Sequence, residues 1–319
     1  MTQLAAADVD LTTSVAGATL PNPVMTASGC AAAGRELHQF FDVADLGAVV
    51  TKSIMLDPRA GRATPRMAET PSGMLNSIGL QGPGIDAFLA TDLPWLLQHR
   101  ARPVVSIAGA SLGEYAELAR RVGNDPGVTA VEVNISCPNV ENRGLVFACD
   151  PYQAAKVVSV VCRETPRGVP VLAKLSPDVT SIVDIASSVI EAGASGLTLI
   201  NTLLGLAIDP GTLRPVLAGV TGGLSGPAIR PVALRAVWQV HEAMPDVPIV
   251  GVGGIRTGYD ALEFMLAGAC AVQVGTVIFN DPSAPIRIVH ELADELAARG
   301  FAKAADAVGL AHLARPGRP

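Results

Sequence analysis

The sequence predicts an α/β fold in which eight strands close into a parallel barrel with helices outside it. Eight short apolar segments are bounded by turn residues, and helical patterns of roughly 10–16 residues follow most of them. Strands that alternate with helices form a parallel sheet, and eight such units close most naturally into a (β/α)8 barrel, the TIM barrel. An open, doubly wound sheet is the competing interpretation.

Each element is expected to begin where the spacing of apolar residues changes from that of a strand to that of a helix, or the reverse. The expected strands span residues 24–27, 48–51, 104–107, 131–135, 171–174, 196–200, 249–251 and 271–274. The expected helices span residues 85–97, 112–122, 151–164, 182–192, 231–243, 259–267 and 285–299.

Three segments lie outside this repeat. Residues 1–20 carry the pattern of a small hairpin, which we expect to plug the bottom of the barrel. The connections 53–84 and 203–229 exceed the length of about 12–15 residues beyond which loops of a compact domain are usually functional or disordered. We expect both to be long loops over the barrel mouth, with residues 57–64 as a candidate mobile lid. No linker interrupts the chain, so residues 1–319 are predicted to form a single domain.

The composition excludes several classes of partner. A formal net charge of −6 provides no basic surface for nucleic acid or for an anionic membrane. No run reaches the roughly 18 apolar residues of a transmembrane helix, and the first residues lack the basic and apolar regions of a signal peptide. The five cysteines are widely spaced without a C-x-x-C pair, which indicates neither disulfides nor a metal site. A cytoplasmic protein is expected.

Polar residues or glycines end all eight expected strands, which is where a barrel carries its chemistry. Two lysines and three asparagines among them stand in apolar surroundings, an arrangement that favours a binding site. The residues at these ends are Ser28, Lys52, Ser53, Ser106, Asn134, Cys137, Asn139, Lys174, Asn201, Thr202, Gly251, Gly253, Gly254, Gly275 and Thr276.

The last two strand ends indicate a phosphate site. Gly253-Gly254 and Gly275-Thr276 open helices at the position where barrels bind phosphate with backbone N–H groups. The nearby segment 221–227 adds further glycine. Arg256 stands where the third glycine of a G-x-G-x-x-G dinucleotide motif would be, so a mononucleotide is the expected ligand.

The fourth strand ends in V-E-V-N-I-S-C-P-N, which places Cys137 at a turn beside Asn134 and Asn139. A cysteine buried by packing is the alternative to a reactive thiol there. Lys174 is either a Schiff-base amine or a fixed cation beside an electron-rich cofactor, and the surrounding asparagines favour the cation. Lys52 either pairs with a substrate carboxylate or extends its amine to solvent.

Seven ordered motifs resemble those of the class 1 dihydroorotate dehydrogenases, and most closely the class 1B catalytic subunit. They are T-K-S, L-N-S-I-G-L-Q, N-I-S-C-P-N, A-K-L-S-P, I-N-T, G-G-L-S-G-P-A-I-R-P and G-V-G-G-I, and the resemblance runs over residues 22–279. Class 2 enzymes carry a serine base and a membrane-binding N-terminal extension, and from Cys137 and the first residues of this sequence we expect neither here.

The resemblance implies FMN in the barrel mouth, with dihydroorotate stacked on the flavin, a thiolate that removes a ring proton and a hydride that passes to the flavin. It makes Cys137 the base. The implied substrate-binding residues are Lys52, Asn76, Ser77, Ile78, Gly79, Leu80, Asn134, Asn139, Asn201 and Thr202. The implied flavin-binding residues are Ser28, Lys52, Ser53, Asn134, Lys174, Ile200, Gly226, Gly253, Gly254, Gly275 and Thr276. No metal is implied.

The class 1B resemblance also implies a partner subunit that carries FAD and an iron–sulfur cluster and passes electrons to NAD, and it implies a homodimeric core. Fumarate, as in class 1A, is the alternative acceptor. Ser106 and Gly82 stand where the family commonly has asparagine, and residues 141–147 also depart from its pattern, which leaves another dihydropyrimidine as the alternative substrate. A lysine aldolase and a non-catalytic phosphate-binding barrel are the more distant alternatives.

Overall fold

The predicted barrel is confirmed: eight parallel strands form one sheet that closes on itself. The computed structural model describes residues 4–135 and 150–313. The sheet has the order β3-β14-β13-β10-β9-β8-β7-β4, and its neighbours pair in parallel. Its strands are β3 (Val24–Thr26), β4 (Val49–Val50), β7 (Pro103–Ile107), β8 (Ala130–Asn134), β9 (Val171–Leu175), β10 (Gly196–Leu199), β13 (Ile249–Val252) and β14 (Ala271–Val274).

The seam between β3 and β4 closes the barrel through a few bonds. A parallel bridge joins Met25 to Ala48, and the Gly47 N–H donates to the Val24 carbonyl at 2.8 Å. The buried Thr26 hydroxyl accepts from the Val50 N–H at 2.9 Å and lies 3.2 Å from the Val50 carbonyl, to which it can donate. A side chain therefore supplies the bonds that a regular backbone ladder supplies elsewhere in the sheet.

Helices cover the outside of the barrel, and capping residues in the sequence set where several of them begin. Ser111, Asp150, Ser181 and Thr257 each accept a hydrogen bond from a backbone N–H in the first turn of the helix that follows. The helices are α1 (Ile85–Ala87), α2 (Leu93–Gln98), α3 (Leu112–Gly123), α4 (Pro151–Glu164), α5 (Ile182–Glu191), α6 (Arg230–Ala243), α7 (Gly258–Leu266), α8 (Ala284–Ala298) and α9 (Leu310–Leu313).

The helix expected over residues 85–97 is not continuous. A π-helical segment, η4 (Phe88–Asp92), separates α1 from α2. Pro94 lies at the start of α2 and has no N–H to donate to the carbonyl four residues earlier, so the regular α-helical ladder is interrupted there.

The N-terminal hairpin occupies the bottom of the barrel, as expected. Strands β1 (Thr13–Val15) and β2 (Ala18–Leu20) pair in antiparallel register. Val15 and Leu20 are buried in one cluster with side chains from the first half of several barrel strands, among them Val104, Leu172 and Val250. The end of the barrel opposite to the carboxyl ends of its strands is thereby filled with apolar side chains.

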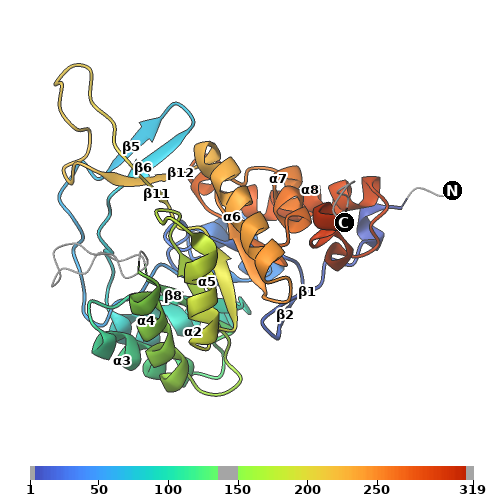
Figure 1. Cartoon of the computed structure of the whole chain (residues 1–319), viewed down its shortest axis with the longest axis horizontal. Coiled ribbons are helices and arrows are strands. Elements are labelled where there is room, and N and C mark those ends of the chain that lie inside the picture. The colour runs from blue at the N-terminus through green and yellow to red at the C-terminus, as the bar shows by residue number, and fades with distance from the viewer. Residues whose placement is uncertain (1–3, 136–149, 314–319) are drawn as a thin grey trace.

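The two long connections form a structure that was not expected. They contribute strands to one four-stranded antiparallel sheet of order β11-β12-β6-β5, which lies together on the side of the molecule away from both termini (Figure 1). The strands are β5 (Met67–Thr70), β6 (Gly73–Asn76), β11 (Leu203–Gly205) and β12 (Gly222–Ser225). Both connections lie over the barrel mouth as expected. The pairing within them was not foreseen, because β6 and β12 are about 150 residues apart and meet only once the barrel brings them together.

No helix in residues 4–135 and 150–313 combines the length and apolarity needed to cross a membrane.

We predict that Thr26→Val destabilises the protein by about 1–3 kcal/mol, because the Val50 N–H loses its acceptor in a buried position. Urea denaturation followed by circular dichroism measures this difference. Thr19→Val, on an exposed position of β2, is the matched control and is expected to change the free energy of unfolding by less than about 0.5 kcal/mol. Equal effects of the two substitutions would contradict the role of Thr26 in barrel closure.

Candidate functional site

One large cavity lies at the carboxyl ends of the barrel strands, beneath the four-stranded sheet. Its volume is about 1360 Å³, which exceeds the roughly 300–1,000 Å³ of most small-molecule sites and leaves room for two ligands. Every residue that the resemblance assigns to the site and that the structure describes lines it. These residues are Ser28, Lys52, Ser53, Asn76, Ser77, Ile78, Gly79, Leu80, Asn134, Lys174, Ile200, Asn201, Thr202, Gly226, Gly253, Gly254, Gly275 and Thr276.

Cys137 and Asn139, the remaining two predicted site residues, lie outside the described residues. The strand that leads to them is observed as β8, and it ends at Asn134 as the alternation in the sequence indicates. The buried Tyr115 hydroxyl donates to the Asn134 carbonyl at 2.8 Å, which fixes the end of β8 against α3.

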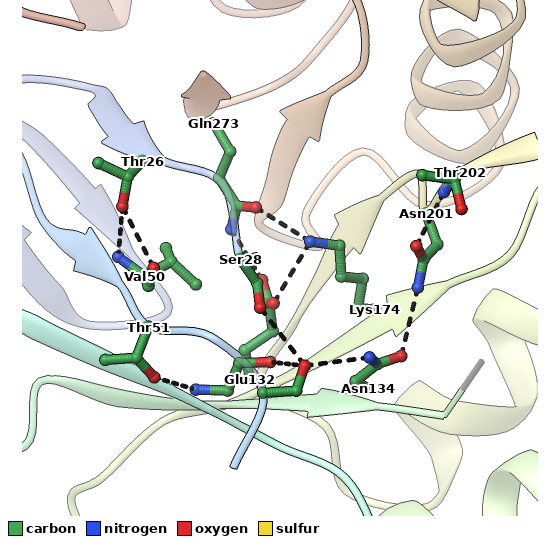
Figure 2. Close-up of polar contacts among 12 residues, drawn as sticks. Thr26, Ser28, Val50, Thr51, Glu132, Asn134, Lys174, Asn201, Thr202 and Gln273 are labelled. Carbon is green, nitrogen blue, oxygen red and sulfur yellow. Dashed lines mark hydrogen bonds and ion pairs between the residues drawn. The ribbon is translucent and has the colours of Figure 1, made fainter. Parts of the chain in front are cut away.

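A row of hydrogen-bonded side chains crosses the floor of the cavity (Figure 2). The Asn134 amide donates to the Ser53 hydroxyl at 3.1 Å, and the Asn201 amide donates to the Asn134 side-chain oxygen at 3.2 Å. The Asn201 oxygen in turn accepts from the Thr202 N–H at 2.8 Å. Asparagine amides both donate and accept, so this row can present either polarity to a planar ligand that carries amide groups.

Ser106 extends the row downward, because its buried hydroxyl lies 3.0 Å from that of Ser53. Ser28 joins it more loosely, with its hydroxyl 3.4 Å from Ser53. The serine at position 106 thus places a second hydroxyl in contact with that of Ser53.

Two lysines put positive charge on the cavity wall. Lys52, at the end of the β4 segment, is half-buried and passes beside Gly29: an ideal Cβ at Gly29 would stand 3.9 Å from the Lys52 amine. Lys174 comes from β9 and is almost completely buried, with 5% of its surface exposed. Both lysines line the cavity, and they come from different strands of the barrel.

The Lys174 ammonium is held by two buried side chains that are not among the predicted site residues. Its Nζ lies 3.4 Å from Glu132 Oε1 and 3.3 Å from Gln273 Oε1, and Gln273 Nε2 donates to Glu132 Oε2 at 2.7 Å. The signal that could have found both is alternation: Glu132 precedes Asn134 by two residues and Gln273 precedes Gly275 by two, so each faces the barrel interior.

Three glycine segments meet at the other end of the cavity. An ideal Cβ at Gly254 would stand 2.7 Å from the Gly226 carbonyl oxygen, and one at Gly226 would stand 2.9 Å from the Gly73 Cα, so side chains are excluded at both positions. Gly226 and Gly254 have φ values of 90° and 75°, which favour glycine. Backbone can therefore approach a ligand closely here, as a phosphate site requires.

The loop after Gly254 is held in place by the buried Asp260. Its carboxylate accepts from the N–H groups of Arg256 and Thr257 at 2.8 and 3.1 Å, and it forms an ion pair with Arg230. Across the same pocket, the Thr276 hydroxyl bonds that of Ser225 at 2.8 Å.

The segment Asn76 to Leu80 forms the far wall under the four-stranded sheet. The Asn76 amide donates to the Gly223 carbonyl at 3.3 Å, and Arg62 donates to the Ser77 hydroxyl at 2.8 Å. The candidate lid at residues 57–64 contacts this wall, since the Arg62 N–H donates to the Ile78 carbonyl at 2.9 Å. Arg62 lines the cavity but is not among the predicted site residues.

Cys30 is the one described cysteine that lines the cavity. Burial raises its pKa to about 11, although the nearby charges of Lys174 and Lys52 act in the opposite direction. The thiol therefore remains protonated at neutral pH and cannot serve as a base there. Among the described residues, no three His, Cys, Asp or Glu side chains are grouped so that they could hold a metal ion.

Comparison with known proteins gives one consistent result. The family model described as dihydroorotate dehydrogenase matches residues 10–296. A protein of Geotalea daltonii is 52% identical over 300 residues, which are 94% of this chain and 97% of that protein; one of Geobacter sulfurreducens has the same identity and coverage. A protein of Trichlorobacter lovleyi is 52% identical over 290 residues, 91% of this chain and 94% of its own. All three are named dihydroorotate dehydrogenase B (NAD(+)), catalytic subunit.

We predict that Cys30 reacts slowly with iodoacetamide in the native protein at pH 7.5 and faster as the pH rises toward 11, because only the thiolate attacks and burial keeps its population low. Mass-spectrometric peptide mapping measures the rate. The same peptide in urea-unfolded protein, with a thiol pKa of about 8.5, is the control. Equal rates in native and unfolded protein at pH 7.5 would contradict a raised pKa of the Cys30 thiol.

Proposed function

The chain belongs to the dihydroorotate dehydrogenase family, and from this premise we propose that it oxidises (S)-dihydroorotate to orotate in the biosynthesis of pyrimidines, with FMN as its cofactor. The observation that carries the proposal is the hydrogen-bonded row of Ser53, Asn134, Asn201 and Thr202 beneath a cavity with room for two ligands. Lys52 adds a cation for the carboxylate that distinguishes dihydroorotate from uncarboxylated pyrimidines.

The residues around the cavity fit FMN. Close-packed glycine backbone at Gly226, Gly253, Gly254 and Gly275, with the Thr276 hydroxyl, suits a phosphate. We assign the remaining flavin contacts to residues deeper in the barrel mouth, namely Ser28, Lys52, Ser53, Asn134, Lys174 and Ile200. When bound, FMN supplies an acceptor for the hydride that the substrate loses.

The substrate contacts are assigned to the asparagine row and to residues 76–80, and they share Lys52 and Asn134 with the flavin contacts. The row of asparagines can donate to the ring carbonyls and accept from the ring N–H groups, while Lys52 pairs with the carboxylate. The residues proposed to contact substrate are Lys52, Asn76, Ser77, Ile78, Gly79, Leu80, Asn134, Asn139, Asn201 and Thr202. Together they orient the ring and exclude water from it.

We assign the base to Cys137, whose thiolate accepts the proton that leaves the ring carbon as the neighbouring carbon loses hydride. This role needs a thiol that can be deprotonated near neutral pH. Cys30 does not meet the requirement, since burial raises its pKa to about 11. Cys162 and Cys270 do not line the cavity. Cys137 follows Asn134 by three residues and is thus tied by the chain to the asparagine row.

We further propose that electrons leave through a partner subunit with FAD and an iron–sulfur cluster and reach NAD. The names of the relatives support this, since they specify NAD(+) and a catalytic subunit. We also propose a cytoplasmic homodimeric core in which residues 1–319 form a single domain. The single domain is supported by a large buried cluster that extends from Val9 to Ala307.

Cys137→Ala is predicted to retain FMN while the rate of flavin reduction by dihydroorotate falls by about 10²–10⁴-fold, the usual contribution of a general base. Anaerobic stopped-flow absorbance measures this rate. Cys162→Ala, on α4 and away from the cavity, is the matched control and is expected to keep the wild-type rate. A Cys137→Ala protein that is reduced as fast as wild type would remove the base from this residue.

Lys52→Met is predicted to weaken orotate binding by about 10–100-fold, because it removes a charge-assisted bond to the carboxylate. Titration of the flavin absorbance with orotate gives the dissociation constant, and the FMN content is checked in the same sample. The control is Lys156→Met, at a surface position of α4. Unchanged orotate affinity in Lys52→Met would exclude an ion pair between Lys52 and the substrate.

A further inference from the structure

The ammonium of Lys174 is one corner of a closed ring of three side chains from three strands (Figure 2). Glu132 on β8 and Gln273 on β14 each contact it, at 3.4 and 3.3 Å, and they bond each other at 2.7 Å. Lys174 lines the cavity whereas Glu132 and Gln273 do not. The carboxylate thus lies behind the ammonium as seen from the cavity.

The burial of the ring makes its two charges interdependent. Glu132 is 0% and Gln273 1% exposed. A buried ammonium without its counter-ion is strongly disfavoured, and such a group loses its proton or moves toward water. Glu132 is the only described carboxylate that forms an ion pair with Lys174 within 4.0 Å. Glu132 therefore supplies the counter-charge that holds the Lys174 side chain in the barrel interior.

The amide of Gln273 restricts the geometry further. Gln273 Nε2 donates to Glu132 Oε2, so the other carboxylate oxygen, Oε1, is directed at the ammonium. The side-chain oxygen of Gln273 makes the second contact with Lys174 Nζ. Gln273 reaches across the barrel, because three strands of the sheet order separate β14 from β8. The ammonium is thus fixed from two sides of the barrel, and its remaining hydrogen can point toward the cavity.

We propose that Glu132 is a positioning residue that, together with Gln273, holds the Lys174 amine in place and directs it at the electron-accepting group in the cavity. This inference rests on the proposed function, which places the flavin beside Lys174. A preorganised cation stabilises negative charge that arrives with electrons, so it favours the reduced cofactor. The pair of Lys174 and Glu132, and not Lys174 alone, sets this effect.

The test is the midpoint potential of the bound flavin at pH 7, measured by anaerobic reduction against a reference dye. Glu132→Gln keeps the shape of the side chain but removes its charge, and Lys174→Met removes the ammonium. Both substitutions are expected to lower the midpoint potential by at least about 30 mV. For a two-electron couple, this shift lowers the ratio of reduced to oxidised flavin tenfold at a fixed potential. The double variant should show no further fall beyond Lys174→Met, because Glu132 acts through Lys174.

Two further variants separate positioning from general stability. Glu132→Asp keeps the charge and is expected to recover part of the wild-type potential. Thr26→Val disturbs the barrel wall without changing charge, so it should lower the melting temperature and leave the potential unchanged. If Glu132→Gln does not fold, Gln273→Leu replaces it, with both charges kept and a smaller fall in potential expected.

The possible results distinguish the inference from the function on which it rests. A potential in Glu132→Gln equal to that of wild type overturns the inference, and so does a raised potential, which would mean that Glu132 only opposes the charge of Lys174. A wild-type protein that binds no FMN overturns the proposed function as well. A normal flavoprotein in which only Lys174→Met lowers the potential overturns the inference and leaves the function standing.

Discussion

Closure of the sheet between β3 and β4 is the constraint on which the rest of the structure depends. Only a closed barrel brings the ends of all its strands to one rim, so that residues far apart in the sequence can surround one cavity. The closing strands are short, and the Thr26 hydroxyl takes part in joining them. The same closure pairs β6 with β12 above the rim and so roofs the cavity with an antiparallel sheet.

The barrel interior changes in polarity from bottom to top. Apolar side chains and the N-terminal hairpin fill the lower part, the ring of Glu132, Lys174 and Gln273 lies above them, and the asparagine row ends at the cavity. Charge is thus kept away from water yet next to the ligand, where its electrostatic effect is greatest. The apolar side chains at the bottom hold the strands together, and the polar side chains above them determine which ligand the cavity binds.

The fold and much of the cavity could be predicted because their signals are local. Alternation in V-E-V-N-I identified β8, and a polar residue or glycine at each strand end marked the rim of the cavity. The pairing of β6 with β12 and the bond from Gln273 to Glu132 could not be predicted, since they join segments some 140 or more residues apart. The π segment before Pro94 was missed because apolar periodicity alone continues through it.

The measurement that most directly tests the account is anaerobic titration of the purified protein with dihydroorotate, followed by absorbance. The account predicts a yellow protein whose flavin absorbance bleaches with about one equivalent of dihydroorotate as orotate appears, and does not bleach with dihydrouracil or dihydrothymine, which lack the carboxylate. A colourless protein, or a flavin bleached by the uncarboxylated rings and not by dihydroorotate, would contradict it.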